Sequence, residues 1–254
     1  GRANALTDLA DVHRMTGDHA RAIPLLDEAL ADFRAAGDRL GQADALTYLG
    51  IVRHYTGEYP HAEEALDRAL DLYRDLGDRR GQANALAFLG KVRTRRGDGT
   101  GALDACLEAL DLYRSLDSRL GQANMLCDLS VLRRTTGDLA GAVQASTTAL
   151  DLYVGLAVRG GETEAHNELG VVHRLGGDLS RARAHHHRAL LLAREAGRPW
   201  DEATALAGLG RCALASGDTQ DAATRLGQAL DLFRRIGAAD AAGVEAELAG
   251  LVSD

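Results

Sequence analysis

Residues 69–80 read Ala-Leu-Asp-Leu-Tyr-Arg-Asp-Leu-Gly-Asp-Arg-Arg, and variants of this phrase recur every 40 residues along the chain. Rows of 40 align residues 1–240 without a gap, so each residue has a repeat position from 1 to 40. Positions 22 and 29 are Ala in every row, and position 30 is always Leu. Self-similarity at such a fixed period is typical of a repeat architecture.

In the first row Gly-Asp occurs at Gly17-Asp18 and again, twenty residues on, at Gly37-Asp38. Gly suits the left-handed conformation just past a helix end, and Asp accepts hydrogen bonds from the first amides of the next helix. Each row therefore predicts two helices of roughly 17 residues joined by tight turns.

Apolar residues in each row follow helical spacing rather than strand alternation. In the second row the expected core positions are Leu46, Leu49, Val52, Ala62, Leu66, Ala69, Leu70 and Tyr73. Position 10 is Gly in four rows, although Gly in a helix interior costs about 1 kcal/mol relative to Ala. We therefore expect the two helices of a row to approach closely there, with position 10 against the Ala of position 22.

Leu-Gly at positions 9 and 10, Gly-Asp at 17 and 18, Ala at 22 and 29 and Leu at 30 resemble the tetratricopeptide repeat motif in order and spacing. The 40-residue period is most similar to the variety found in Leu-Gly-Asn-type adaptors, kinesin light chains and C-terminal sensor regions of large bacterial regulators. The resemblance implies an all-α, right-handed superhelical solenoid of six antiparallel helix hairpins plus a terminal helix. The implied repeats are 1–40, 41–80, 81–120, 121–160, 161–200 and 201–240, followed by a C-terminal capping helix or truncated seventh repeat at 241–254.

The terminal segment begins a seventh row, with Leu248 and Gly250 at positions 8 and 10, one residue from the Leu-Gly register. A solenoid needs an end element that covers the last apolar face. We expect one helix packed on the second helix of repeat 6. Its apolar residues are Val244, Leu248, Leu251 and Val252, and its polar ones are Glu245, Glu247, Ser253 and Asp254.

In function, the resemblance implies a non-catalytic scaffold that holds a protein or peptide in a groove lined by the first helices. It also suggests the interaction or sensor domain of a larger cytoplasmic bacterial regulator, in signalling or transcription. We assign no catalytic, cofactor-binding or metal-ligating residue. An alternative is a structural module that self-associates through its ends into dimers or filaments.

The composition of the chain limits the kinds of partner that it is expected to bind. The formal charge of −8 argues against a surface that binds nucleic acid, which needs a net basic face. No apolar run approaches the roughly 18 residues that cross a bilayer. The three cysteines, at unrelated repeat positions, show no disulfide or zinc spacing, which fits a reducing cytoplasm.

If positions 6, 9 and 12 face the core, positions 4, 7, 8, 11, 14 and 15 lie on the opposite stripe of the first helix. Position 8 is aromatic in adjacent rows, at Tyr48 and Phe88. Aromatic, Arg and Asn side chains together are typical of an interface hot spot, although the two rings could instead cover the seam between repeats. The candidate partner-binding residues are Tyr48, Asn84, Phe88, Lys91, Arg95, Asn124 and Arg134.

The cations of this set favour an acidic or carboxylate-bearing partner. Asp44 and Asp128 are close enough in the repeat pattern to pair with them instead.

Repeat 5 concentrates histidine, with His166 at a core position, His173 at position 13 and the run 185–187 on the second helix. The resemblance implies that positions 6 and 26 pack together, which would bring His166 near His186. One hypothesis is a metal-dependent site, because imidazole is a common ligand. The other is a polar patch in a diverged repeat, with neighbouring histidines directed differently around the helix.

Overall fold

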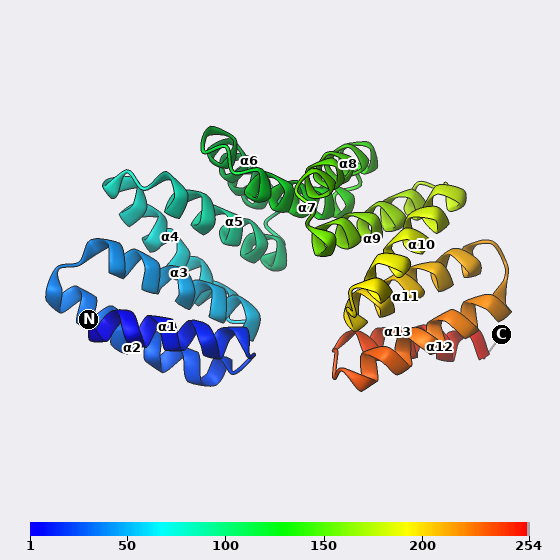
Figure 1. The fold of residues 1–254 in the computed structure, drawn as a ribbon, viewed down its shortest axis with the longest axis horizontal. Coiled ribbons are helices and arrows are strands. Elements are labelled where there is room, and N and C mark those ends of the chain that lie inside the picture. Colours follow the sequence, from blue (N-terminus) through cyan, green and yellow to red (C-terminus); the bar gives the residue numbers. More distant parts are fainter. Residues whose placement is uncertain (253–254) are drawn as a thin grey trace. The chain divides into compact units, whose positions relative to one another are not determined.

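The computed structural model describes residues 1–252, and over that range the chain forms α-helices and no strand (Figure 1). Connections of two to four residues join helices α1 Arg2–Met15, α2 His19–Ala36, α3 Arg39–Thr56, α4 Tyr59–Leu76, α5 Arg79–Arg96, α6 Gly99–Ser115, α7 Arg119–Thr135, α8 Leu139–Gly155, α9 Arg159–Leu175, α10 Leu179–Glu195, α11 Pro199–Ala215, α12 Thr219–Arg235 and α13 Asp240–Val252. The predicted all-helical fold is confirmed. Ser253 and Asp254, predicted as polar residues of the terminal segment, lie outside the described residues.

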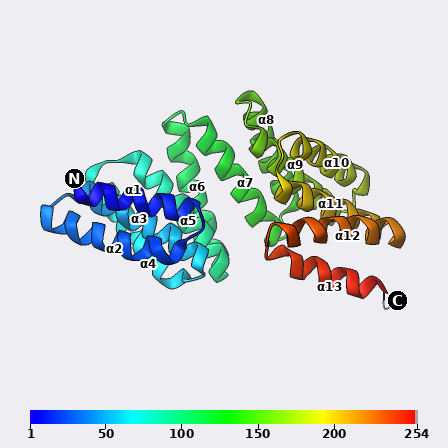
Figure 2. The same cartoon turned by 60° about the horizontal axis from the view of Figure 1, so that its bottom comes forward.

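The helices group into two compact units, residues 1–128 and 129–254. In the first unit each helix from α1 to α6 packs on the next, and α3 also contacts α1 and α5 (Figures 1 and 2). In the second unit α8 to α13 pack in chain order, and α9 also contacts α11. Within each unit, the first helices of successive repeats therefore lie side by side.

Gly-Asp pairs end one helix and begin the next, as predicted. Gly37 has φ 67°, and Asp38 accepts a hydrogen bond of 2.9 Å from the amide of Gly41. Two rows place another residue at the left-handed position, Asp117 with φ 49° and Ala157 with φ 56°. A residue with a Cβ pays about 1–2 kcal/mol for this conformation.

The core lies where the helical spacing predicts it, and all eight core residues named for the second row are buried. The first row departs from this pattern, because Leu9 is 46% exposed whereas Leu49 at the same repeat position is 2% exposed. α3 packs between α2 and α4, but α1 contacts only α2 and α3 in the described first unit. Burial at position 9 therefore depends on a preceding helix as well as on the residue.

Close approach at position 10 is confirmed. A Cβ added at Gly50 would lie 2.5 Å from Leu66 Cγ and 3.1 Å from the carbonyl oxygen of Ala62. The contact thus involves position 26 as well as the expected position 22.

A second small position was not predicted. Each first helix of repeats 2 to 5 begins near a Gly at position 1, packed against the aromatic ring at position 33 of the preceding repeat. A Cβ added at Gly161 would lie 2.3 Å from the ring of Tyr153. Repeat 6 has Asp201 at this position, and the preceding aromatic is replaced by Ala193. Gly at position 1 of repeats 2 to 5 therefore accompanies an aromatic residue at position 33 of the preceding repeat.

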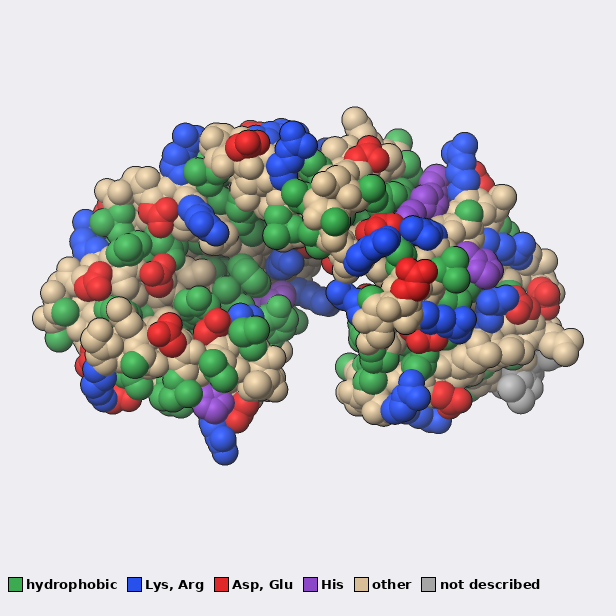
Figure 3. Space-filling view, viewed as in Figure 1, with side chains coloured by type: hydrophobic (Ala, Val, Ile, Leu, Met, Phe, Trp, Pro, Cys, Tyr) green, Lys and Arg blue, Asp and Glu red, His purple; other side chains and the backbone are tan. Residues whose placement is uncertain are grey.

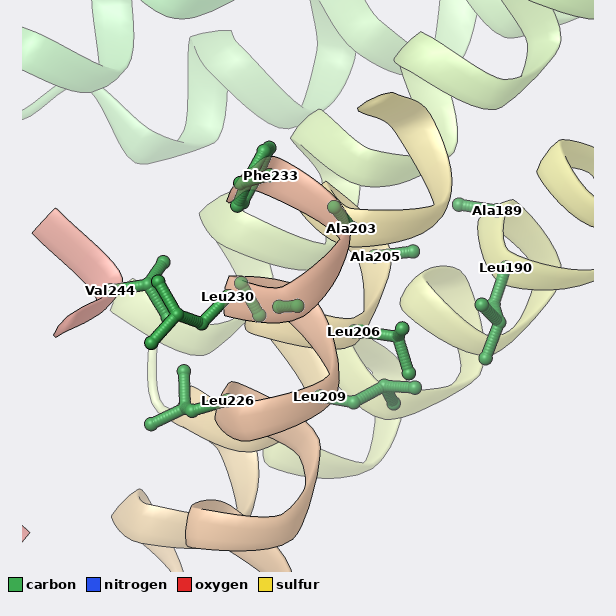
Figure 4. Close-up of a cluster of buried hydrophobic side chains, with 12 residues drawn as sticks. Ala189, Leu190, Ala203, Ala205, Leu206, Leu209, Leu226, Leu230, Phe233 and Val244 are labelled. Atoms are coloured by element: carbon green, nitrogen blue, oxygen red, sulfur yellow. The ribbon is translucent and has the colours of Figure 1, made fainter. Parts of the chain in front are cut away.

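α13 packs on α12. Figure 4 shows the cluster that joins them, in which Val244 of α13 lies beside Leu230 of α12. Val244 is buried, while Leu248 and Leu251 are partly buried against the same cluster.

Candidate functional site

The seven candidate residues lie on first helices of their repeats and reach the surface. Asn84, Arg95 and Asn124 are exposed, and the other four are partly buried. Six of them belong to the first unit, on α3, α5 and α7. Arg134 belongs to the second unit, where its Nε donates a 2.6 Å hydrogen bond to Glu168.

Lys91 sits at the centre of the candidate set in the first unit. Its Nζ lies 5.7 Å from the centre of the Phe88 ring and 3.2 Å from Asp128 Oδ2. The first contact is a cation–π interaction, and the second is the pairing that the sequence left open. Much of the positive charge of Lys91 is therefore balanced within the chain.

Asn84 is held by a tyrosine from the second helix of its own repeat. The hydroxyl of Tyr113 donates a 2.7 Å hydrogen bond to Asn84 Oδ1, as Tyr73 does to Asp44 Oδ1 one repeat earlier. Asn84 is exposed, so its amide group can donate to a ligand carbonyl.

Tyr48 forms part of an open pocket of about 470 Å³ in the first unit. The pocket is lined by Asn4, Thr7, Asp8, Phe33, Asp38, Leu40, Gly41, Asp44 and Tyr48. Burial, reinforced by nearby carboxylates, raises the pKa of Tyr48, and burial also raises the pKa of Asp44. Burial is the main cause of both shifts, and nearby carboxylates add to it.

Position 7 was expected on the exposed stripe, and this was wrong. Thr47, Ala87, Cys127 and Asn167 are all buried. Neighbouring first helices contact one another, as α3 does α5, so this edge of each helix faces the next repeat instead of solvent. The exposed stripe is therefore narrower than helical geometry alone predicts.

The histidines of repeat 5 also differ from expectation. His166 Nδ1 lies 3.0 Å from Nδ1 of His185, and the ring of His173 stacks on His185 at 5.4 Å. His186 is instead fully buried, with its Nδ1 3.3 Å from Asn167 Oδ1. Consecutive residues point about 100° apart around a helix, so only one of the adjacent pair can meet His166.

Three broader properties bear on partners. Figure 3 shows acidic and basic side chains intermixed on the face in view, without a continuous basic area. In residues 1–252 no helix is long and apolar enough to cross a bilayer. Within the same range no three His, Cys, Asp or Glu side chains are grouped to hold a metal ion.

Helical hairpins of 40 residues, stacked through small residues and exposing mixed polar stripes, define a helical-repeat protein of the interaction-scaffold class. The tetratricopeptide repeat family model matches residues 1–75, 81–153 and 162–235. The chain belongs to the tetratricopeptide repeat family. Such repeats are in general non-catalytic protein-interaction scaffolds.

Comparison with curated proteins gave no match in sequence. Among solved structures, the chain is similar to BtubC (BKLC) from P. vanneervenii, with 20% identity, TM-score 0.73 and coverage of 86% of this chain and 92% of that chain. A signal transduction ATPase with a tetratricopeptide repeat sensor, from Pyrococcus horikoshii, is 16% identical with TM-score 0.78, over 98% of this chain and 38% of that chain. A Rap protein complexed with competence and sporulation factor is 15% identical with TM-score 0.74, over 99% and 75%. The TM-scores show a shared fold.

Proposed function

We propose that the chain is a non-catalytic scaffold that binds a protein or peptide segment along α1, α3 and α5 of the first unit. The observation that carries the proposal is the open pocket beside Tyr48, on the same helical stripe as Phe88. A concave site with an aromatic wall and a few polar groups is the usual form of a recognition pocket.

The charged residues along this surface indicate which charges the partner should carry. Three aspartates line the Tyr48 pocket, which suits a basic or amide-bearing side chain. Arg95 is exposed and makes no hydrogen bond or ion pair with the described residues, so it can bind a partner carboxylate. Lys91 contributes less to acid binding because Asp128 already pairs with it. We therefore propose a segment of mixed charge, with its acidic group at Arg95.

Selection from a displayed library of random 12-residue peptides tests the proposal. Peptides enriched on the wild-type chain should fail to bind a Tyr48→Ala/Phe88→Ala variant that melts cooperatively. Leu107→Ala, an exposed apolar truncation on α6, is the matched control and should bind normally. Equal binding by all three proteins would contradict the proposal that this surface binds the peptide.

Self-association through the ends is a second candidate, favoured by the exposed apolar side chains Leu9, Val12 and Met15 on α1. A Leu9→Asp/Val12→Asp variant should abolish a dimer formed at this end. The Tyr48→Ala/Phe88→Ala variant should leave such a dimer intact. Sedimentation analysis of the two variants separates the candidates.

We further propose that the chain serves a cytoplasmic bacterial regulator as its interaction or sensor domain. Support comes from the likeness to the ATPase whose tetratricopeptide repeat is described as a sensor. A nucleotide-binding or DNA-binding region in the same gene product would support this role. A gene product without either would argue against it.

A further inference from the structure

A contact between two histidines joins the helices of repeat 5. Nδ1 of His166 on α9 lies 3.0 Å from Nδ1 of His185 on α10, and the ring of His173 stacks on His185 with ring centres 5.4 Å apart. These histidines occupy positions 6 and 25 of the row, where repeats 2 to 4 all have Leu and Ala. The α9–α10 hairpin therefore contains a contact that depends on protons, at two positions that are apolar in those repeats.

The distance between the two Nδ1 atoms requires a particular protonation state. They form a hydrogen bond only if one nitrogen carries a hydrogen and the other presents its lone pair. A proton added to Nε2 of the donor ring leaves this bond in place. When both rings are protonated, both Nδ1 atoms are donors, so the bond is lost. Two positive rings then face each other with centres 5.2 Å apart, which is unfavourable.

The surroundings of the pair within α9 and α10 oppose a second proton. Burial, with the neighbouring His185, lowers the pKa of His166 to about 4, although Glu162 acts in the other direction. The carboxylate of Glu162 already binds Arg159 and Arg188. Burial also lowers the pKa of His185, and the nearby His173 and Arg181 reinforce this. For His173, burial and Arg181 lower the pKa, while Asp178 acts in the other direction.

The helices packed on either side of the hairpin, α8 and α11, supply no compensating acid to the pair. α8 has one charged side chain, Asp151, which is exposed. The charged residues of α11 are paired elsewhere: Asp201 with Arg198, Glu202 with Arg194 and Arg211 with Glu247.

We propose that His166 and His185 make repeat 5 an acid-sensitive hairpin: protonation of both rings breaks their hydrogen bond, and α9 and α10 then separate locally. The open hairpin accepts protons that the closed hairpin excludes. In the open state His166 regains its ordinary pKa of 6.5, so the contribution of its neutral ring to stability is complete above that pH and declines as the pH falls toward 4. For His166 alone, this linkage raises the opening equilibrium constant about eightfold between about pH 7 and about pH 5.5. His185, whose pKa is also lowered, adds to the increase.

Hydrogen exchange of the whole chain, measured by mass spectrometry at the same two pH values and corrected for the intrinsic exchange rate, tests the proposal. Peptides from α9 and α10 should lose protection by about eightfold or more at the lower pH. Peptides from α5 and α6, which contain no histidine and have Leu86 and Ala105 at the two positions, should keep theirs.

The variant His166→Leu/His185→Ala restores the residues of repeats 2 to 4 and should reduce the acid response by about eightfold or more. His186, whose pKa burial lowers to about 3, stays in both proteins, so the difference between them isolates the pair. His187→Asn, an exposed substitution on α10, should respond like wild type. If the double variant does not fold cooperatively, His166→Leu alone decides the outcome.

Nitrogen-15 NMR of histidine-labelled protein at neutral pH gives a readout that stability does not affect. One ring of the pair should carry its hydrogen on Nδ1, as the hydrogen bond requires. The proposal is overturned if both rings carry it on Nε2. It is equally overturned if the histidine-free pair responds to acid as wild type does, or if α5 and α6 lose as much protection as α9 and α10.

Discussion

Replacing Gly161 by Ala tests the packing of position 1 against the preceding aromatic. The new Cβ would lie 2.3 Å from two ring carbons of Tyr153, which is buried and cannot move into solvent. Overpacking of this kind costs about 1–3 kcal/mol, while Ala gains up to about 1 kcal/mol over Gly in helix propensity. We expect a net loss of about 1–2 kcal/mol in the free energy of unfolding.

Gly227→Ala is the matched control, since it is the same substitution in a helix of the same unit. A Cβ at Gly227 meets nothing within 4 Å, so only the propensity gain of up to about 1 kcal/mol remains. Urea melts followed by helical circular dichroism at 222 nm measure both. Thermal midpoints should fall by about 2–8 °C for Gly161→Ala and rise for Gly227→Ala. If Gly161→Ala is as stable as wild type, the contact does not determine the residue at position 1.

Three further outcomes are expected. Ala157→Gly should raise the free energy of unfolding by about 1 kcal/mol in urea melts, because Ala157 occupies the left-handed region; no gain would show that the turn relaxes at no cost. Lys91→Ala should change stability by about 0.5 kcal/mol or less, since its ion pair with Asp128 is partly solvated, and a much larger loss in the same assay would place Lys91 in the core. Deletion of residues 241–254 should lower the melting temperature and increase light scattering, because Leu230 loses its cover; an unchanged, monomeric protein would remove the capping role.

The helices and their turns could be predicted from the sequence because residues close together in the chain determine them. Gly37 and Asp38 act through their own backbone and the next helical turn. Their role can therefore be predicted without knowing which helices pack nearby. The burial of Leu49 follows from helical spacing for the same reason. Leu9 occupies the same repeat position, yet its exposure depends on which helices pack against α1.

Contacts between residues far apart in the sequence were less predictable. The sequence left Lys91 free to bind a ligand or an internal acid, and only the alignment of α5 with α7 shows the Asp128 pairing. His166 was expected near His186, whereas a rotation of one residue along α10 brings His185 to it. The change from Gly161 to Asp201 was visible in the rows, but its cause lies in the residue 8 positions earlier, which is the Tyr153 ring in one case and Ala193 in the other. Such errors concern directions of side chains around a helix, which a period alone does not determine.

The buried ring of His186 limits how freely this array can be rearranged by recombination. It occupies a position that is Leu in three other rows, and it fits because Gly170 and Gly208 have no side chain. A Cβ at Gly208 would lie 2.3 Å from its Cε1. In the second and third rows the residue equivalent to Gly208 is Tyr48 or Phe88, neither of which leaves space for an imidazole. Repeat 5 therefore depends on the repeat that follows it: a repeat with Tyr or Phe at position 8 in place of Gly208 would clash with His186.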